Sequence, residues 1–188
     1  MARPRSDERR SAIMRAAVHV IATDGLGAPT ATIAKEAGVS NGSLFTYFET
    51  KSELLNQLYI ELKTEMAAVA LKGLPSNSDV RTQLLHMWRH WLHWAVSCPE
   101  KRRALARLSE SGDITPQSRL ATHQAMLGIA ALLERSRKKG PLRNAPLGFV
   151  SALMSAMADT TMDFMISDPA NADKHSAAAF DALWRIVA

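Results

Sequence analysis

The sequence predicts an all-helical protein of about nine helices. Ala, Leu and Met dominate the long stretches, Gly and Pro cluster at a few boundaries between them, and no stretch shows the apolar-polar alternation of a strand. An apolar fraction of 47% in 188 residues is ample for a core and argues against disorder. This length suits one sizeable domain or a small domain joined to a larger one.

Residues 30–54 predict two short helices that meet at a tight turn. The first begins near Pro29 or Thr30, and Gly38 ends it at a position where a positive φ is cheapest for glycine. Ser40 can then cap a second short helix over residues 41–47. This second helix turns an apolar side inward, formed by Leu44 and Phe48. A polar helix supported in this way is the geometry that enters a DNA major groove, as in helix-turn-helix proteins.

The remaining helices follow from caps and prolines. The first helix of the chain is expected to begin at Ser6, an N-cap followed by two acidic residues, and to end at residues 25–27. Thr50-Lys51-Ser52-Glu53 forms a capping box that opens a long fourth helix. The later helices are expected over about residues 80–97, 99–112, 116–138, 147–167 and 173–188.

The net positive charge permits DNA binding but does not indicate which part of the chain binds DNA. The net charge is +5, yet residues 1–63 hold 8 Lys/Arg against 7 Asp/Glu, whereas residues 99–143 hold 10 against 4. The argument for DNA therefore rests on the motif. A lone cysteine, Cys98, suits a reducing cytoplasm, and the sequence shows neither a signal peptide nor a membrane span. We expect a cytoplasmic protein.

The arrangement of these helices resembles the TetR family of transcription regulators. The resemblance is densest in the helix-turn-helix, at residues 33–34, 37–40, 42, 44, 47–48, 51 and 54–55. The rest of the chain is similar to the RamR branch of that family, which is associated with multidrug-efflux regulation, most clearly at residues 1–6, 58–59, 160–164, 168–170 and 180–185. The resemblance implies a DNA-binding domain over residues 1–50 and a ligand-binding and dimerisation domain over residues 51–188.

By the same resemblance, the third helix is the recognition helix. Phe45 stands where the family usually has tyrosine, so a hydroxyl for a phosphate is missing there. A helix N-terminus with a lysine attracts phosphate, and Asn41 could instead read adenine. The alternative is that these polar residues only solvate a short helix. The implied DNA-binding set is Thr30, Thr32, Ser40, Asn41, Gly42, Ser43, Phe45, Thr46, Tyr47 and Lys51.

Arginines near the N-terminus offer a second DNA contact. Arg3, Arg5, Arg9 and Arg10 could form an arm along the DNA backbone or minor groove. A frayed, solvated terminus is the equal alternative.

The fifth helix carries three histidines on one face and tryptophans on the other. His86 and His90 are spaced to chelate a metal, but no Asp, Glu or Cys joins them locally, so a solvated face is the preferred interpretation and no metal or cofactor is expected. Trp88 and Tyr59 match aromatic positions of the RamR effector pocket, with a plain hydrophobic core as the alternative. Met154 and Ser151 stand where an aromatic and an acidic residue are expected, which weakens a preference for cations. The implied ligand-binding set is Tyr59, Leu62, Trp88, Trp91, Ser151 and Met154.

The last two helices are the expected homodimer interface. Small residues on the eighth helix allow close approach, and large apolar ones follow, although some of them must serve the chain's own core. These residues are Ser151, Ser155, Ala156, Ala158, Phe164, Phe180, Leu183 and Trp184.

The resulting hypothesis is a homodimeric repressor that binds a palindromic operator in double-stranded DNA. A small lipophilic effector would release it, and efflux or detoxification genes are the expected targets. The alternative is a ligand-independent DNA-binding regulator or activator. The sequence contains no Gly-rich phosphate loop, no nucleophile with a placed base and no convergent carboxylates, so we do not expect an enzyme.

Overall fold

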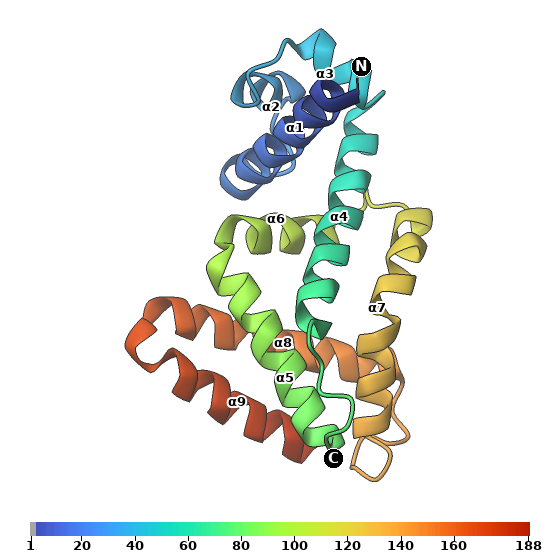
Figure 1. Cartoon of the computed structure of the whole chain (residues 1–188), viewed down its shortest axis with the longest axis vertical. Helices are drawn as coiled ribbons and strands as arrows, with labels where there is room; N and C mark the ends of the chain where they lie inside the picture. Colours follow the sequence, from blue (N-terminus) through green and yellow to red (C-terminus); the bar gives the residue numbers. More distant parts are fainter. Residues whose placement is uncertain (1–2) are drawn as a thin grey trace. The chain divides into compact units, whose positions relative to one another are not determined.

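A computed structural model describes the backbone of residues 3–188 and the side chains from Ser6 onward. All regular secondary structure in this part of the chain is helical, which confirms the predicted fold class (Figure 1). Its elements are α1 (Arg3–Asp24), α2 (Thr30–Glu36), α3 (Asn41–Tyr47), α4 (Lys51–Leu71), α5 (Val80–Ser97), α6 (Pro99–Glu110), α7 (Pro116–Ser136), α8 (Leu147–Ser167), the 3-10 helix η1 (Pro169–Asn171) and α9 (Ala172–Val187).

Several helix starts are fixed by side-chain caps. The Ser40 hydroxyl accepts a hydrogen bond from the Ser43 N–H at 3.1 Å, and Gly38 has the positive φ of 68° that ends the preceding helix. The Thr50 hydroxyl accepts from the Glu53 N–H at 3.0 Å, and Thr115 caps α7 in the same way. The returning bond of the capping box differs: the Glu53 carboxylate accepts from the N–H of Glu49, one residue before the cap.

The predicted start of the first helix is wrong. Helix α1 begins at Arg3, so Ser6 lies inside the helix and does not cap it. A proline in the first turn does not prevent this, because the N–H groups of that turn have no partner within the helix. One arginine of the predicted arm, Arg10, bonds through its guanidinium to Gln57 and Glu61 of α4, while its side chain stays 40% exposed. The arm itself stays a prediction. The side chains of Arg3 and Arg5 lie outside the described residues.

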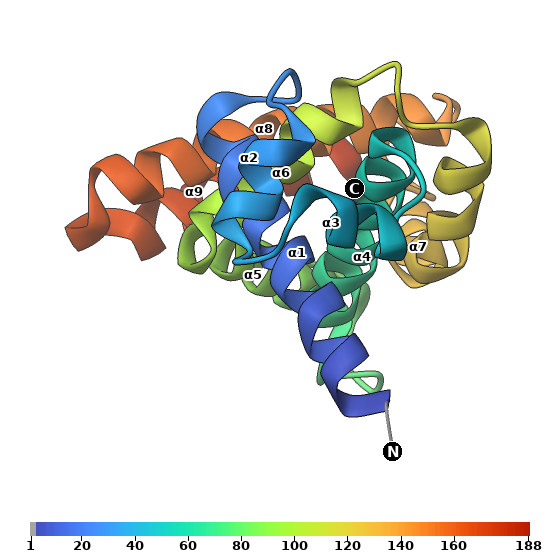
Figure 2. The same ribbon diagram turned by 90° about the horizontal axis from the view of Figure 1, so that it is seen from above.

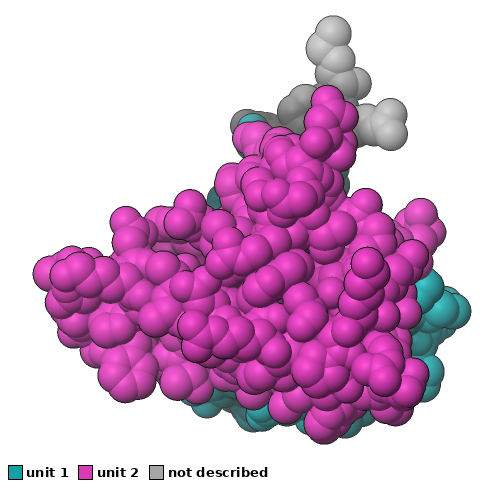
Figure 3. Space-filling model, turned by 90° about the horizontal axis from the view of Figure 1, so that it is seen from below, with its two compact units in different colours: residues 1–64, 98–123 teal, residues 65–97, 124–188 magenta. Residues whose placement is uncertain are grey.

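The chain divides into two compact units, coloured separately in Figure 3. The first contains residues 1–64 and 98–123, and the second contains residues 65–97 and 124–188. Helices α4 and α7 each run from one unit into the other. The boundary predicted after residue 50 separates the chain by function, whereas these units separate it by compactness. That boundary therefore stays a prediction.

Within the first unit, α1, α2 and α3 form a small bundle seen from above in Figure 2. Its core includes Ile13, Ile21, Ile33, Leu44 and Phe48, each at most 1% exposed. Helix α6 packs along α1 and is held at both ends. Here Glu100 pairs with His19 at 3.0 Å, and the Arg107 guanidinium donates to the Ile21 carbonyl.

Within the second unit, α8 and α9 pack side by side, and α5 packs on both (Figure 1). The loop after α7 passes close to the end of α9. A Cβ atom on Gly140 would lie 1.9 Å from the Val187 carbonyl oxygen, so only glycine fits there without a shift of the backbone.

In the part of the chain that is described, no helix combines the length and apolar character needed to cross a membrane.

Candidate nucleic-acid interface and effector region

Helix α3 presents a polar surface because its apolar residues are turned inward. Leu44 and Phe48 are fully buried, as predicted, and fix the inner side of the helix. Asn41, Gly42 and Thr46 are exposed, and Phe45 is 41% exposed. An exposed phenyl ring on an otherwise polar helix can contact the methyl group of thymine but cannot hydrogen-bond a phosphate.

Some polar groups of this surface already have partners. The Thr46 hydroxyl donates to the Gly42 carbonyl at 3.3 Å, and Ser40 is occupied as the cap. The Lys51 ammonium donates to the Ala28 carbonyl at 2.7 Å, which ties the start of α4 to the loop before α2. An ammonium has three donors, so this bond leaves two for a phosphate. Thr30 and Thr32 are half-buried in the first turn of α2. The predicted DNA contacts of all these residues stay predictions.

Comparison with known proteins agrees with this geometry. The pattern of "Bacterial regulatory proteins, tetR family" matches residues 13–58. The HTH-type transcriptional regulator BetI of Stenotrophomonas maltophilia (strain R551-3) is 31% identical over a 166-residue alignment that covers 71% of this chain and 82% of BetI.

The chain belongs to the TetR family. It is accordingly a DNA-binding transcription regulator of the helix-turn-helix type. A TetR family regulator from Shewanella sp. PV-4 shares its fold with a TM-score of 0.83 and 27% identity, over 94% of this chain and 96% of that one. The regulator FadR of Bacillus subtilis, solved in complex with stearoyl-CoA, shares the fold with a TM-score of 0.69 and 16% identity, over 92% and 96% of the two chains.

The predicted effector residues of this TetR-family chain are divided between the two units. Tyr59 and Leu62 lie on α4 in the first unit, where the Arg119 guanidinium is 5.8 Å from the centre of the Tyr59 ring. Trp88 and Trp91 lie on α5 in the second unit, with Ser151 and Met154 on α8. Since α5 packs on α8, the structure brings these four onto neighbouring helices.

Trp88 is the centre of an aromatic cluster in the second unit. It is fully buried, and its ring lies 6.3 Å from Trp91 and 6.4 Å from Phe180. Its indole N–H donates to the Ser176 carbonyl at 3.2 Å, so the polar edge of the ring is satisfied. Burial of this kind suits a core residue as well as the wall of a ligand site. The alternatives at Trp88 therefore stay open.

One polar contact in this region was not predicted. The Trp94 indole N–H donates to the Glu65 carboxylate at 2.9 Å, which links α5 to α4 within the second unit. A tryptophan that is buried requires a partner for its N–H, which is the only sequence signal for this contact. The partner itself lies 29 positions away and has no local pattern.

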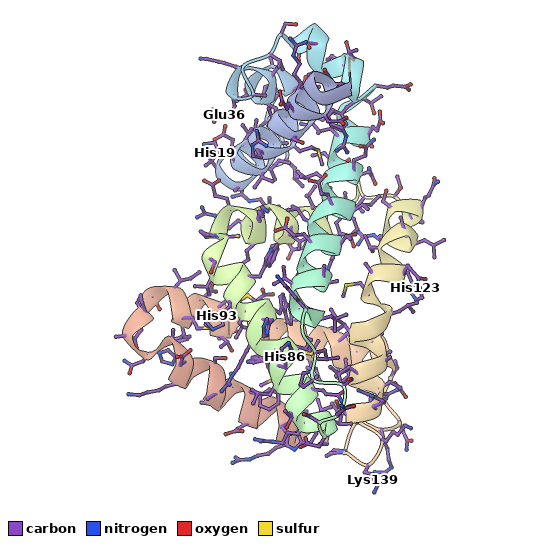
Figure 4. All side chains as sticks on the ribbon, in the orientation of Figure 1. His19, Glu36, His86, His93, His123 and Lys139 are labelled. Atoms are coloured by element: carbon purple, nitrogen blue, oxygen red, sulfur yellow. The ribbon has the colours of Figure 1, made fainter. Side chains whose placement is uncertain are left out.

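The histidines of α5 are involved in backbone contacts. His86 Nε2 lies 2.8 Å from the Lys72 carbonyl, and His90 Nδ1 lies 2.9 Å from the His86 carbonyl. The two rings stack with centres 3.9 Å apart, while His93 is exposed further along the helix (Figure 4). Among the described residues, no group of three or more His, Cys, Asp or Glu side chains is placed to hold a metal ion.

Helices α8 and α9 expose an apolar surface. Phe164 is 56% and Phe149 52% exposed on α8, and Ile186 is exposed on α9. A shallow groove of about 380 Å³ lies between the two helices, lined by Ala156, Met157, Thr160, Thr161 and Ala179.

The residues predicted for the dimer interface are not all on this surface. Ala158 is fully buried, and Phe180 and Leu183 are 1% exposed, so these three serve the core of the chain itself. Ala156 and Phe164 are exposed. Helical periodicity explains the division, since residues 149, 153, 156, 160 and 164 follow one stripe of α8, and Ala158 lies on the opposite side.

Proposed function

We propose that this TetR-family regulator is a homodimeric repressor that a small lipophilic effector releases from its operator. The aromatic cluster of Trp88, Trp91, Phe180 and Trp184 in the second unit carries the proposal. These rings follow one another at 6.3–6.4 Å between centres. Such a concentration of aromatic surface suits the binding of flat or aliphatic apolar molecules.

A palindromic operator follows from the dimer. Two recognition helices can read successive major-groove faces only when a dimer fixes their separation at about one helical turn or a multiple of it. The apolar stripe of α8 and its neighbour α9 supply a self-complementary surface for this pairing. Small residues at its middle, Ala156 and Thr160, leave space for the partner helix, while Phe149 and Phe164 supply apolar area at the ends.

The proposal also covers the kind of effector and the kind of target genes. FadR of Bacillus subtilis, which has this fold, was solved with stearoyl-CoA, a ligand with a long apolar chain. In the present chain, the similarity to the RamR branch favours control of efflux or detoxification genes. Helices α4 and α7 run from one unit into the other, so a ligand bound in the second unit has continuous helices through which to act on the first. The regulator would act in the cytoplasm, on chromosomal DNA.

The proposal is tested by measuring ligand and DNA binding on the same protein. Footprinting of the DNA upstream of its own gene supplies the operator, and lipophilic compounds are screened by quenching of tryptophan fluorescence. We expect a compound that quenches the fluorescence to weaken operator binding at least tenfold, which is about 1.4 kcal/mol of coupling. Trp91→Ala, at a half-buried ring, should reduce this response and leave operator affinity without ligand unchanged.

A compound that binds without weakening operator binding would show that the effector site and the DNA site are not coupled. If no lipophilic compound has any effect, the alternative of a ligand-independent regulator is favoured. DNA binding alone does not distinguish the two, because both require it.

A further inference from the structure

The recognition helix cannot hold its own orientation. Helix α3 has seven residues, and Leu44 is the one buried residue among them. Isolated helices of this length are not stable in water, because nucleation is costly and few hydrogen bonds repay it. Its orientation therefore depends on the segments that fix its two ends. One of these segments is the turn into α4 at residues 48–50.

A chain of side-chain hydrogen bonds leads from α1 to that turn. The Arg10 guanidinium Nη2 donates to Gln57 Oε1 at 2.8 Å. The same Gln57 amide donates through Nε2 to Glu53 Oε1, also at 2.8 Å. The other oxygen of Glu53, Oε2, accepts from the backbone N–H of Glu49 at 2.7 Å. Three consecutive bonds thus connect the first helix with the backbone directly after the recognition helix.

Arg10 makes a second contact with the same turn. Its guanidinium carbon lies 5.5 Å from the centre of the Phe48 ring, which is fully buried at the end of α3. A guanidinium over an aromatic face is attracted by the ring, and it also covers the ring from water. The pair that Arg10 forms with Glu61 at 3.7 Å is half-exposed and contributes little.

We propose that Arg10 and Gln57 are positioning residues that hold the recognition helix in its DNA-reading orientation. Arg10 acts through its contacts with Gln57 and Phe48, and not on a phosphate. Each bond of the chain includes a charged group, either the Arg10 guanidinium or the Glu53 carboxylate, and such bonds are stronger than neutral ones. The Gln57 amide has both a donor and an acceptor, so it can bond to the Arg10 guanidinium and to the Glu53 carboxylate at the same time. The proposal rests on DNA binding by this family member.

The test compares variants of the full-length protein on one duplex, selected from a random library by the wild-type protein. Arg10→Met removes the cation and both contacts, whereas Gln57→Leu breaks the chain without a change of charge. Arg15→Met is the matched control, since it removes the same charge from an exposed position on the same helix. Melting curves and the oligomeric state are measured for each variant, so that affinities refer to folded protein.

We expect Arg10→Met and Gln57→Leu each to weaken operator binding about tenfold, whereas Arg15→Met stays within about twofold of the wild type. The double variant Arg10→Met/Gln57→Leu should be no weaker than Arg10→Met alone, because Arg10→Met already breaks the chain that Gln57→Leu breaks. Arg10→Lys, which keeps a cation near Phe48 and a donor for Gln57, should recover affinity to within about threefold. The dependence of affinity on salt should be unchanged in Gln57→Leu, since no phosphate contact is lost.

Several results would overturn the proposal. Equal losses in Arg10→Met and Arg15→Met would indicate a general effect of charge. A decrease of the salt dependence in Arg10→Met by about one phosphate contact per subunit, with wild-type affinity in Gln57→Leu, would indicate that Arg10 contacts DNA directly. If Arg10→Met does not fold, Gln57→Leu decides alone. Failure of the wild-type protein to select any duplex would instead count against its DNA binding.

Discussion

At the scale of single residues, the buried Asn56 has hydrogen-bond partners for both the nitrogen and the oxygen of its amide. It is 8% exposed on α4, and its amide nitrogen donates to the carbonyls of Ser52 and Asp113, at 2.8 and 2.9 Å. Its amide oxygen accepts from the N–H and the hydroxyl of Thr115, at 2.9 and 3.2 Å. The residue thereby fixes the loop between α6 and α7 on α4. Buried polar groups are costly when they lose such partners.

Truncation of this side chain should destabilise the protein clearly. Asn56→Ala leaves the Asp113 carbonyl and the Thr115 N–H without their partner, and we expect a loss of about 2 kcal/mol in the free energy of unfolding. Urea denaturation measures it. Asn144→Ala is the control, because it makes the same substitution at an exposed loop position. Similar midpoints for the two variants would contradict the role given to Asn56.

Neither Asn56 nor Arg10 could be assigned its partners from the sequence. Two partners of Asn56, Asp113 and Thr115, lie 57 and 59 positions away, and Gln57 lies 47 positions from Arg10. No local periodicity relates such positions, because the tertiary fold alone brings them together. The inward orientation of Leu44 and Phe48 was predictable, since it depends on helical spacing within one short segment.

At the scale of elements, helix boundaries were predictable where a capping side chain or a proline directly precedes the helix. Helices α3, α5 and α8 have the predicted ends, and Ser40 and Asp79 provide side-chain caps for the first two of these helices. Helix α1 starts three residues before Ser6, because a serine followed by acidic residues is a cap only if the chain before it is not helical. The sequence around Ser6 has the composition of a helix start, but no residue before it stops the helix.

The pairing of α1 with α6 should make stability depend on pH. The pKa of His19 is raised, first by its hydrogen bond with Glu100 and then by the negative charges of Glu100, Glu36 and Asp24. Figure 4 shows His19 and Glu36 on neighbouring helices. A raised pKa in the folded state stabilises the protein below the pKa of the unfolded state, about 6.5, and the effect is lost as pH rises through the folded value.

His19→Gln should therefore lower the melting temperature at pH 5.5 and have a much smaller effect at pH 8.5. The comparison between variant and wild type at each pH removes the contribution of groups that titrate in both proteins. His123→Gln, at an exposed position of α7, is the matched control for the substitution itself. A difference for His19→Gln that is the same at both pH values would mean that protonation does not strengthen the pair with Glu100.

At the scale of the whole molecule, the exposed apolar surface of α8 and α9 requires an explanation. Phe149 and Phe164 on α8 and Ile186 on α9 are large side chains left 40–56% exposed. In the homodimer proposed above, a second copy of the chain would cover these side chains. Two copies related by a twofold axis would also provide the two recognition helices that a palindrome needs.

Ala156→Arg should separate the dimer without unfolding the chain. Ala156 is exposed in the lining of the groove, so a long cation is solvated in the monomer but clashes with a partner helix. Sedimentation should change from twice the mass of the chain to the mass of one chain. Affinity for the palindromic duplex should decrease about 100-fold, because each half-site is then bound separately. Ala121→Arg, at an exposed position of α7, should keep the wild-type mass and affinity. A dimer that persists in Ala156→Arg would place the interface on another surface.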